Sequence, residues 1–268
     1  MPASSDAGSA IITAPATTTD GLLGGRVRYT QPERGFRSGL EPVLLAAAIP
    51  ARAGQRVLEA GCASGAGLLC LATRVAGVEG VGVDCDPALV RLAIGNAAQN
   101  GMPGLRFAVA DVMAEALPHG AGDQGRCGFG GFGRFHHAFA NPPYHPDSGA
   151  ASPDPGRRRA KQAEPGLIGA WTTALAGCLH PRGTLTLILP PAALPEVLAA
   201  MQAANCAARA MLPLWPRLGR PARLLLVQGV RAGRSPFRVL PGLVLHEADG
   251  FTPAADAVLR DAAALPMA

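Results

Sequence analysis

Short apolar runs alternate with amphipathic stretches from residue 56 onward, and this alternation is the clearest structural signal in the chain. The apolar runs that predict strands are Arg56–Ala60, Val81–Asp84, Leu105–Ala110 and His136–Ala140. Between them, Gly65–Val75 and Pro87–Asn100 have helical character, and the second begins with proline and ends at Asn-Gly, as helices commonly do. A βαβαβ order predicts an α/β fold with a parallel sheet covered by helices.

The rest of the chain continues this pattern without a visible second domain. Further predicted elements are a helix over Leu167–Cys178, a strand over Thr184–Leu189, a helix over Leu194–Ala204, a strand over Arg223–Val230, an extended segment over Pro241–Thr252 and a short helix over Pro253–Ala263. We therefore expect one domain over residues 21–268. Residues 1–20 contain few large apolar side chains and are predicted to be a disordered tail. The glycine-rich stretch 118–134 is predicted to be a flexible insertion.

A glycine-rich turn follows the first predicted strand. It has the sequence Glu59-Ala60-Gly61-Cys62-Ala63-Ser64-Gly65-Ala66-Gly67 and leads into a helix. Glycines let the backbone turn tightly and approach a ligand, and the N-terminus of a helix offers free N–H groups. Dinucleotide-binding proteins hold pyrophosphate in a similar turn, so the glycines alone do not identify the ligand.

Three carboxylates near the strand ends narrow the choice of ligand. Glu59 precedes the glycines, Asp84 ends the second strand and Asp111 follows the third. Glu59 would repel pyrophosphate but can bind an amino group, directly or through water. Asp84 lies where a carboxylate accepts ribose hydroxyls, and Asp111 could accept from an adenine amine. The set predicts an adenosyl amino acid, although each acid could instead be a helix cap, as we expect for Asp86.

The sequence Asn141-Pro142-Pro143-Tyr144 follows the fourth strand, at the edge where open α/β sheets bind ligands. An adenine amine is a poor nucleophile because its lone pair is delocalised into the ring. The Asn141 side-chain carbonyl can accept one amine hydrogen and the Pro142 main-chain carbonyl the other, while the prolines make the turn rigid. Tyr144 can stack on the base. We predict a catalytic motif that acts mainly by positioning, in preference to a simple Asn- and Pro-rich turn.

The charge of the chain is basic, with a formal net charge of +5 that comes almost entirely from arginine. A net positive charge favours polyanionic partners such as nucleic acid. The codon bias of a GC-rich genome, however, also favours arginine over lysine. The densest basic run is Arg157, Arg158, Arg159 and Lys161, which could grip RNA phosphates beside a flipped base or simply be a solvated loop. Arg217, Arg220 and Arg223 could extend this basic track.

Several functional classes are not indicated by the sequence. The 6 cysteines form no Cys-x-x-Cys pair and lack the accompanying histidine spacing of zinc sites, so we expect no metal and reduced thiols. The N-terminus lacks the basic start and apolar core of a secretory signal. No apolar run approaches the roughly 20 residues that cross a bilayer. We expect a cytoplasmic protein; nothing in the sequence predicts its oligomeric state.

These features together resemble the class I, Rossmann-like methyltransferases that carry an Asn-Pro-Pro-Tyr/Phe motif. Within that family, the chain resembles the bacterial tRNA adenine-N6 methyltransferases that act on valine tRNA. The segments that carry the closer resemblance are Leu23-Gly24-Gly25-Arg26-Val27, Gln31-Pro32-Glu33-Arg34-Gly35-Phe36-Arg37, Val43-Leu44-Leu45-Ala46-Ala47-Ala48, Gly219-Arg220-Pro221-Ala222-Arg223 and Leu243-Val244-Leu245-His246. They span nearly the whole chain from about residue 21.

The resemblance implies a doubly wound, mostly parallel, seven-stranded sheet with a reversed last strand and helices on both faces. It implies S-adenosylmethionine as the cofactor, bound by Glu59, Gly61, Gly65, Asp84, Asp111 and Asn141, with the segment Phe36, Arg37 and Ser38 closing over its amino-acid end. The chain departs from the family at Ala63, where glycine is usual, and at Glu41-Pro42 in place of Asp-Ala. Alanine is tolerated if the backbone is not left-handed, so we expect a nearly unchanged loop.

The leading functional hypothesis is transfer of a methyl group to the N6 amine of an adenine in RNA, with tRNA as the first candidate. An alternative enzyme is a methyltransferase of a glutamine side chain in a release factor or ribosomal protein, since an amide nitrogen poses the same lone-pair problem. An alternative of another class is a noncatalytic RNA-binding protein that kept the fold. A dinucleotide oxidoreductase is disfavoured by Glu59.

Overall fold

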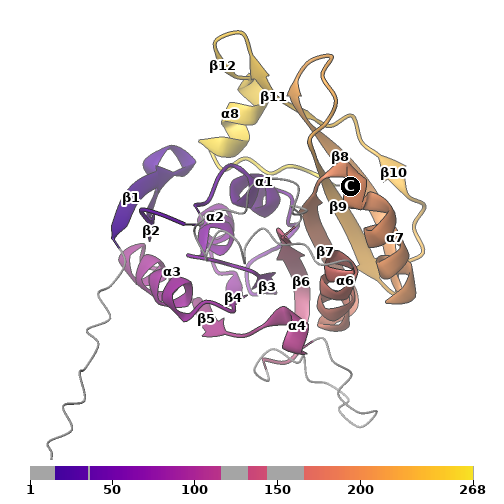
Figure 1. Ribbon diagram of the computed structural model, residues 1–268, viewed down its shortest axis with the longest axis horizontal. Coiled ribbons are helices and arrows are strands. Elements are labelled where there is room, and N and C mark those ends of the chain that lie inside the picture. Colours follow the sequence, from indigo (N-terminus) through magenta and orange to yellow (C-terminus); the bar gives the residue numbers. More distant parts are fainter. Residues whose placement is uncertain (1–15, 36, 116–131, 144–165, 268) are drawn as a thin grey trace, which may run out of the picture.

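The computed structural model describes residues 16–35, 37–115, 132–143 and 166–267 of the chain. Its centre is a mixed sheet with the strand order β12-β11-β8-β9-β7-β6-β3-β4-β5, to which β10 is added beside β8 (Figure 1). The seven central strands are β5 (Leu105–Val109), β4 (Glu79–Asp84), β3 (Arg56–Ala60), β6 (Phe135–Ala140), β7 (Leu179–Leu189), β9 (Leu224–Arg231) and β8 (Cys206–Arg217). All are parallel except β9, which runs antiparallel to both neighbours. The mostly parallel sheet and its reversed strand are therefore confirmed.

The sheet is wider than the seven strands that the sequence predicts. The additional strands are β10 (Arg238–Val239), β11 (Leu243–Glu247) and β12 (Gly250–Phe251). Both β10 and β11 pair in parallel with the outer edge of β8, and β12 returns antiparallel to β11. The expectation of seven strands is corrected to ten because the closing segment pairs with an edge of β8 that would otherwise expose its polar groups.

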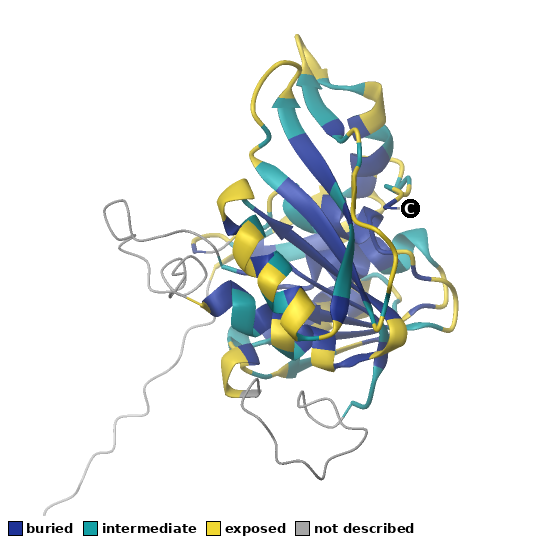
Figure 2. Cartoon of the chain, turned by 90° about the vertical axis from the view of Figure 1, so that its right-hand side faces the viewer, coloured by how far each residue is buried: buried dark blue, intermediate teal, exposed yellow. Residues whose placement is uncertain are grey.

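Helices cover both faces of the sheet and create two cores. One core joins α1 (Glu41–Ala47), α2 (Ala66–Arg74) and α8 (Pro253–Leu259) to the sheet. The other core joins α6 (Leu167–Gly177) and α7 (Leu194–Ala203) to the sheet. Adjacent strand residues alternate between them, as the pleat requires: Leu187 belongs to the second core and Ile188 to the first. Figure 2 shows the buried strands at the centre, with the exposed residues on outer helix faces and turns.

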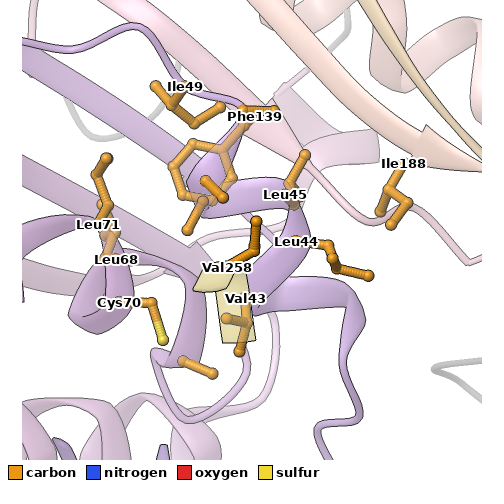
Figure 3. Close-up of a cluster of buried hydrophobic side chains, with 14 of the residues drawn as sticks. Val43, Leu44, Leu45, Ile49, Leu68, Cys70, Leu71, Phe139, Ile188 and Val258 are labelled. Carbon is orange, nitrogen blue, oxygen red and sulfur yellow. The ribbon is translucent and has the colours of Figure 1, made fainter. Parts of the chain in front are cut away.

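The first core reaches the end of β6. Phe139 is fully buried among side chains of α1 and α2, including Leu45 and Leu68 (Figure 3). A methyl group added at Gly67 would come within 2.9 Å of the Phe139 ring. This tight packing fixes the backbone two residues before Asn141, because such a ring has no room to move.

The N-terminal boundary differs from the predicted one. Thr17–Leu22 form strand β1, which pairs antiparallel with β2 (Val27–Pro32). The short 3-10 helix η1 (Leu23–Gly25) connects the two strands. Residues 17–20 therefore belong to the fold and not to a tail; residues 1–15 lie outside the described part. The hairpin is anchored because Val27 and Tyr29 are buried in the first core. The threonines of β1 have the β-branched shape that suits a strand, a signal that composition alone obscured.

The local predictions between residues 56 and 140 are confirmed to within about two residues at each end, including helix α3 (Pro87–Gln99) with Asp86 as its N-cap. Strand β8 was not predicted, since its prolines and alanines are atypical of an inner strand. Most of the glycine-rich stretch 118–134 lies outside the described residues. Cys62, Cys70, Cys85 and Cys206 carry free thiols, whereas Cys178 is disulfide-bonded, so the expectation of reduced thiols is wrong there.

Candidate active site at the carboxyl edge of the sheet

Three residues of interest form a row at the carboxyl ends of neighbouring strands. Ala60 of β3 is paired with Val83 of β4 on one side and with Ala140 of β6 on the other. The next residue along each strand is Gly61, Asp84 and Asn141, respectively. Adjacent strands lie about 4.8 Å apart, so this register brings the glycine turn, the second acid and the Asn-Pro-Pro motif together at one edge.

The glycine turn has a left-handed backbone at three positions. Gly61 and Gly65 have φ values of 66° and 88°, and Ala63 between them has φ 46°. The condition under which alanine is tolerated without strain, a backbone that is not left-handed, is therefore not met at Ala63. An L-residue pays about 1–2 kcal/mol for that conformation, so the backbone of the turn is strained at Ala63. A side chain at Gly61 would also lie 2.9 Å from the indole of Trp171 in α6.

Hydrogen bonds hold the strained turn in place. The Ala63 N–H donates to Asp84 Oδ2 at 2.8 Å, and the Gly65 N–H donates to the Cys62 carbonyl at 2.7 Å. Asn96 of α3, a buried residue, donates from Nδ2 to the Ser64 carbonyl at 2.9 Å. The surrounding structure therefore fixes a backbone conformation that the alanine would not choose by itself.

Glu59 points into the start of helix α2. Its Oε2 accepts the Leu68 N–H at 2.9 Å, and its side chain is 5% exposed. Burial raises the pKa of this carboxyl to about 8, partly offset by the Leu68 hydrogen bond, and nearby Asp84 raises it further. Glu59 thus accepts from the orphan N–H groups at the start of helix α2.

Asp84 closes the turn and still has capacity for a ligand. Its Oδ2 accepts from Ala63 and its Oδ1 accepts the Asp86 N–H at 2.9 Å. Burial raises its pKa, while these two hydrogen bonds act in the opposite direction. A carboxylate has about four lone-pair sites, so each oxygen can accept a further hydroxyl. Asp84 therefore fits the predicted role of holding a diol.

Asp111 is an exposed residue that caps the short helix α4 (Val112–Glu115). Its Oδ1 accepts the Met113 N–H at 2.8 Å. This geometry is that of a helix cap, and the second carboxylate oxygen has no hydrogen-bond partner among the described residues. The neighbouring main chain is tied to the second acid, since the Ala110 N–H donates to the Asp84 carbonyl at 3.0 Å.

Asn141 is the residue of the site with an unsatisfied polar atom. Its Oδ1 is buried and has no hydrogen-bond partner in the part of the chain that the structure describes. Pro142 is buried and Pro143 is partly exposed; Tyr144 lies outside the described residues. A buried acceptor without a donor costs about 1–3 kcal/mol, so natural folds seldom keep one unless a ligand or catalysis requires it.

The segment around Arg37 lies against the N-terminal hairpin. Arg37 donates to Thr18 Oγ1 at 2.7 Å and forms an ion pair with Asp20 at 3.0 Å. These contacts direct its guanidinium toward β1. Phe36 lies outside the described residues. The prediction that Arg37 closes over a cofactor has no support from these contacts.

Ser38 is connected to the glycine turn through Tyr29. The Tyr29 hydroxyl lies 2.8 Å from Ser38 Oγ and also hydrogen-bonds the Ser64 side chain, while burial raises its pKa. Gln31, also buried, accepts the Ser38 N–H at 3.0 Å. Ser38 therefore belongs to the hydrogen-bond network that supports the glycine turn.

Sequence reasoning missed Tyr29, Gln31 and Asn96 as supports of the site. Asn96 Oδ1 accepts the Thr30 N–H at 2.8 Å and its Nδ2 donates to the Thr30 carbonyl at 2.8 Å, so it ties β2 to α3. A signal was available: an asparagine on the apolar face of a helix is unusual and requires partners. The basic run Arg157, Arg158, Arg159 and Lys161 lies outside the described residues.

No protein-family model matches the chain, and no curated protein matches it in sequence. A predicted O-methyltransferase from Agrobacterium tumefaciens superposes with a TM-score of 0.65, at 23% identity over 84% of this chain and 98% of that one. The fold is that of the class I methyltransferases.

Two further solved structures have the same architecture. A methyltransferase subunit of a type I restriction-modification system from Streptococcus thermophilus has a TM-score of 0.55, at 16% identity over 83% of this chain and 51% of that one. A putative class I S-adenosylmethionine-dependent methyltransferase from Listeria monocytogenes has a TM-score of 0.51, at 17% identity over 75% of this chain and 63% of that one. At these identities the likeness concerns the fold.

No helix in the described ranges is long and apolar enough to cross a membrane. Within the same ranges, no group of three or more His, Cys, Asp or Glu side chains could hold a metal ion.

Proposed function

We propose that the chain is an S-adenosylmethionine-dependent methyltransferase that methylates the N6 amine of an adenine in RNA, with tRNA as the first candidate. The observation that carries the proposal is the buried Asn141 Oδ1, which has no donor among the described residues and lies at the strand end beside the glycine turn. An amide oxygen accepts only, so the missing partner must bring an N–H or O–H group. An exocyclic amine has that character.

The residues at the sheet edge fit S-adenosylmethionine. The turn at Gly61 and Gly65 brings main chain close to a ligand, and Asp84 has free lone pairs for a ribose diol. The cofactor, when bound, would supply an electrophilic methyl group on a sulfonium, which would leave as a neutral thioether once the amine nitrogen had taken the methyl. Several solved methyltransferases share this fold, among them one described as S-adenosylmethionine-dependent.

The protein's contribution to the reaction is orientation. Asn141 would accept one amine hydrogen and thereby concentrate the nitrogen lone pair on the side that faces the methyl carbon. The proline pair keeps this acceptor fixed, since Pro142 is buried and both rings restrict φ. After attack the nitrogen carries a surplus proton, which leaves to solvent. Preorganisation of this kind contributes about 7 kcal/mol or more to lowering a barrier when the geometry is well aligned.

RNA is favoured as the substrate by charge and by the sequence resemblance. The chain has a net charge of +5, and the segments flanking the site resemble enzymes that modify tRNA. Phosphate-rich partners bind arginine-rich surfaces through the release of counterions.

The test is to incubate the protein with methyl-labelled S-adenosylmethionine and, separately, with tRNA, ribosomal RNA and a release factor. Digestion and chromatography then identify the labelled residue. We expect N6-methyladenosine from the tRNA sample and no label in any sample with Asn141→Ala. Label in a glutamine side chain, or in a different nucleoside, would overturn the proposal and redefine the substrate.

A further inference from the structure

The turn between β8 and β9 projects from the same edge of the sheet as the candidate active site. β8 runs parallel to the central strands and ends at Arg217, whereas its pairing with β9 stops at Leu214 and Leu224. Beyond that point β8 is paired with β11, with His246 opposite Arg217. The last residues of β8, the turn 218–223 and the β11–β12 hairpin therefore form an extension, here called the distal arm (Figure 1).

Strand register gives the position of the distal arm relative to Asn141. Ala140 is opposite Leu187, Ile188 is opposite Leu226, and Leu226 is opposite Leu212, so Asn141 lies in the row of Leu212. Arg217 is five residues further along β8, about 17 Å, and three strand spacings away, about 14 Å. The separation is therefore about 22 Å, which several consecutive nucleotides of a strand cover at about 3.4 Å each.

The arm carries basic groups without side-chain counterions. Arg217, Arg220 and Arg223 are exposed, and no ion pair is recorded for them in the described part of the chain. Arg217 donates to the main-chain carbonyl of Glu247 at 2.6 Å, which attaches the turn to the neighbouring hairpin. The acids of the arm, Glu247 and Asp249, lie in the β11–β12 hairpin, whereas the turn 218–223 has arginines and no acid. The positive charge of the arm is therefore concentrated on the β8–β9 turn.

An apolar side chain stands at the tip of this basic turn. Leu218 is 87% exposed, the most exposed of the large apolar residues in the described chain. Arginines on both sides of a protruding leucine form a combination that nucleic-acid-binding proteins use, with cations on phosphates and an apolar wedge against base or sugar edges.

We infer that the distal arm binds the phosphate backbone of the substrate RNA at a point remote from the target base, with Arg220 and Arg223 on phosphates and Leu218 against the adjacent nucleotides. The inference rests on the proposed function for its partner and adds a second anchor to it. A base held at Asn141 and a backbone held about 22 Å away would select RNA of defined shape, since both contacts must be made at once.

The experiment measures binding of fluorescein-labelled total tRNA by anisotropy at several salt concentrations. The test variant is Arg220→Glu/Arg223→Glu, and the matched control is Arg52→Glu/Arg234→Glu, an equal charge change at exposed arginines on the opposite edge of the sheet. We expect the test variant to raise Kd about tenfold or more and to flatten the slope of log Kd against log salt by roughly 1.5, while the control changes Kd less than about twofold. Leu218→Ala should weaken binding about threefold without changing that slope.

The inference is overturned if the test and control variants weaken binding equally, or if wild-type protein does not bind tRNA. A failure of the proposed function appears elsewhere, as absent N6-methyladenosine in the labelling assay. Circular dichroism melting of each variant serves as a check, and the salt slope separates lost phosphate contacts from a general loss of structure. If the Arg220→Glu/Arg223→Glu variant melts like wild type and keeps full affinity for tRNA, the distal arm does not bind RNA.

Discussion

The turn after β3 and the turn after β6 lie side by side, yet they differ in how their polar groups are satisfied. In the glycine turn, the Ser64 carbonyl, the Ala63 N–H and both oxygens of Asp84 have partners within the protein. In the Asn-Pro-Pro turn, the buried Asn141 oxygen has none among the described residues. These groups of the first turn are paired within the protein, whereas the Asn141 oxygen of the second turn is left for a donor that the proposed substrate would bring.

The contrast separates preorganisation from recognition. A network whose members are all paired is rigid, and it can hold even the left-handed Ala63. An unpaired buried acceptor is a cost in the free protein that a substrate donor removes on binding. Two asparagines illustrate the difference: Asn96 satisfies both ends of its amide, while Asn141 keeps its oxygen free.

The largest expected effect comes from Asn141→Ala. Losing the acceptor should lower kcat by about 100-fold or more, roughly 3 kcal/mol in the barrier, as seen when single positioned hydrogen-bonding groups are removed from active sites. Because the oxygen has no partner among the described residues, the free energy of unfolding should fall by less than about 1 kcal/mol. Single-turnover kinetics and urea unfolding measure the two quantities.

The control is Asn96→Ala, which should lower the free energy of unfolding strongly and kcat little. It breaks hydrogen bonds between β2, α3 and the glycine turn, so we expect a loss of about 3 kcal/mol of stability, with kcat at saturating cofactor largely preserved. If Asn141→Ala destabilises the protein as much as Asn96→Ala does, the distinction between the two turns is wrong.

The pH dependence of stability tests the buried Glu59 behind the glycine turn. Its pKa rises from the ordinary 4.5 to about 8, so the folded state binds more protons in that window and stability falls as pH rises through it. His137 acts oppositely, because burial lowers its pKa from 6.5 to about 4, but its contribution is constant above pH 6.5. Between pH 6.5 and 8 we expect a loss of up to about 2 kcal/mol.

Urea unfolding at pH 6.5 and at pH 8 measures this change, with Glu59→Gln as the matched variant. The glutamine carries no titrating proton, so its stability should differ little between the two pH values. An equally steep fall in both proteins would assign the effect to another group and remove Glu59 from the explanation.

The smallest expected effect comes from Ala63→Gly. Relief of the left-handed backbone, about 1–2 kcal/mol, opposes the lost methyl burial and the greater freedom of the unfolded chain. We expect stability within about 0.5 kcal/mol of wild type. Ala60→Gly, three residues earlier in an extended and buried strand, lacks the relief and should cost about 1.5 kcal/mol. Thermal unfolding compares the two, and equal losses would contradict strain at Ala63.

The local elements of the central sheet were predictable because their signals are local. Apolar runs, the proline that begins α3 and the asparagine that follows it determine strands and helices without reference to distant residues. Strand β8 was hidden, since Pro213 and Pro216 interrupt its pattern and its pairing depends on β9 and β11. The hairpin of β1 and β2 was hidden for a similar reason: its stability comes from Tyr29 and Val27 in a core assembled by other elements.

The sequence by itself determined the α/β order, the glycine turn, its flanking acids and the position of Asn141 after a strand. Tertiary structure decided the ten-stranded sheet, the left-handed Ala63, the inward direction of Glu59 and the unpaired state of the Asn141 oxygen. The physical reason is range: a motif's residue types follow from the chain, but burial, backbone strain and hydrogen-bond satisfaction depend on which distant atoms fill the surrounding space.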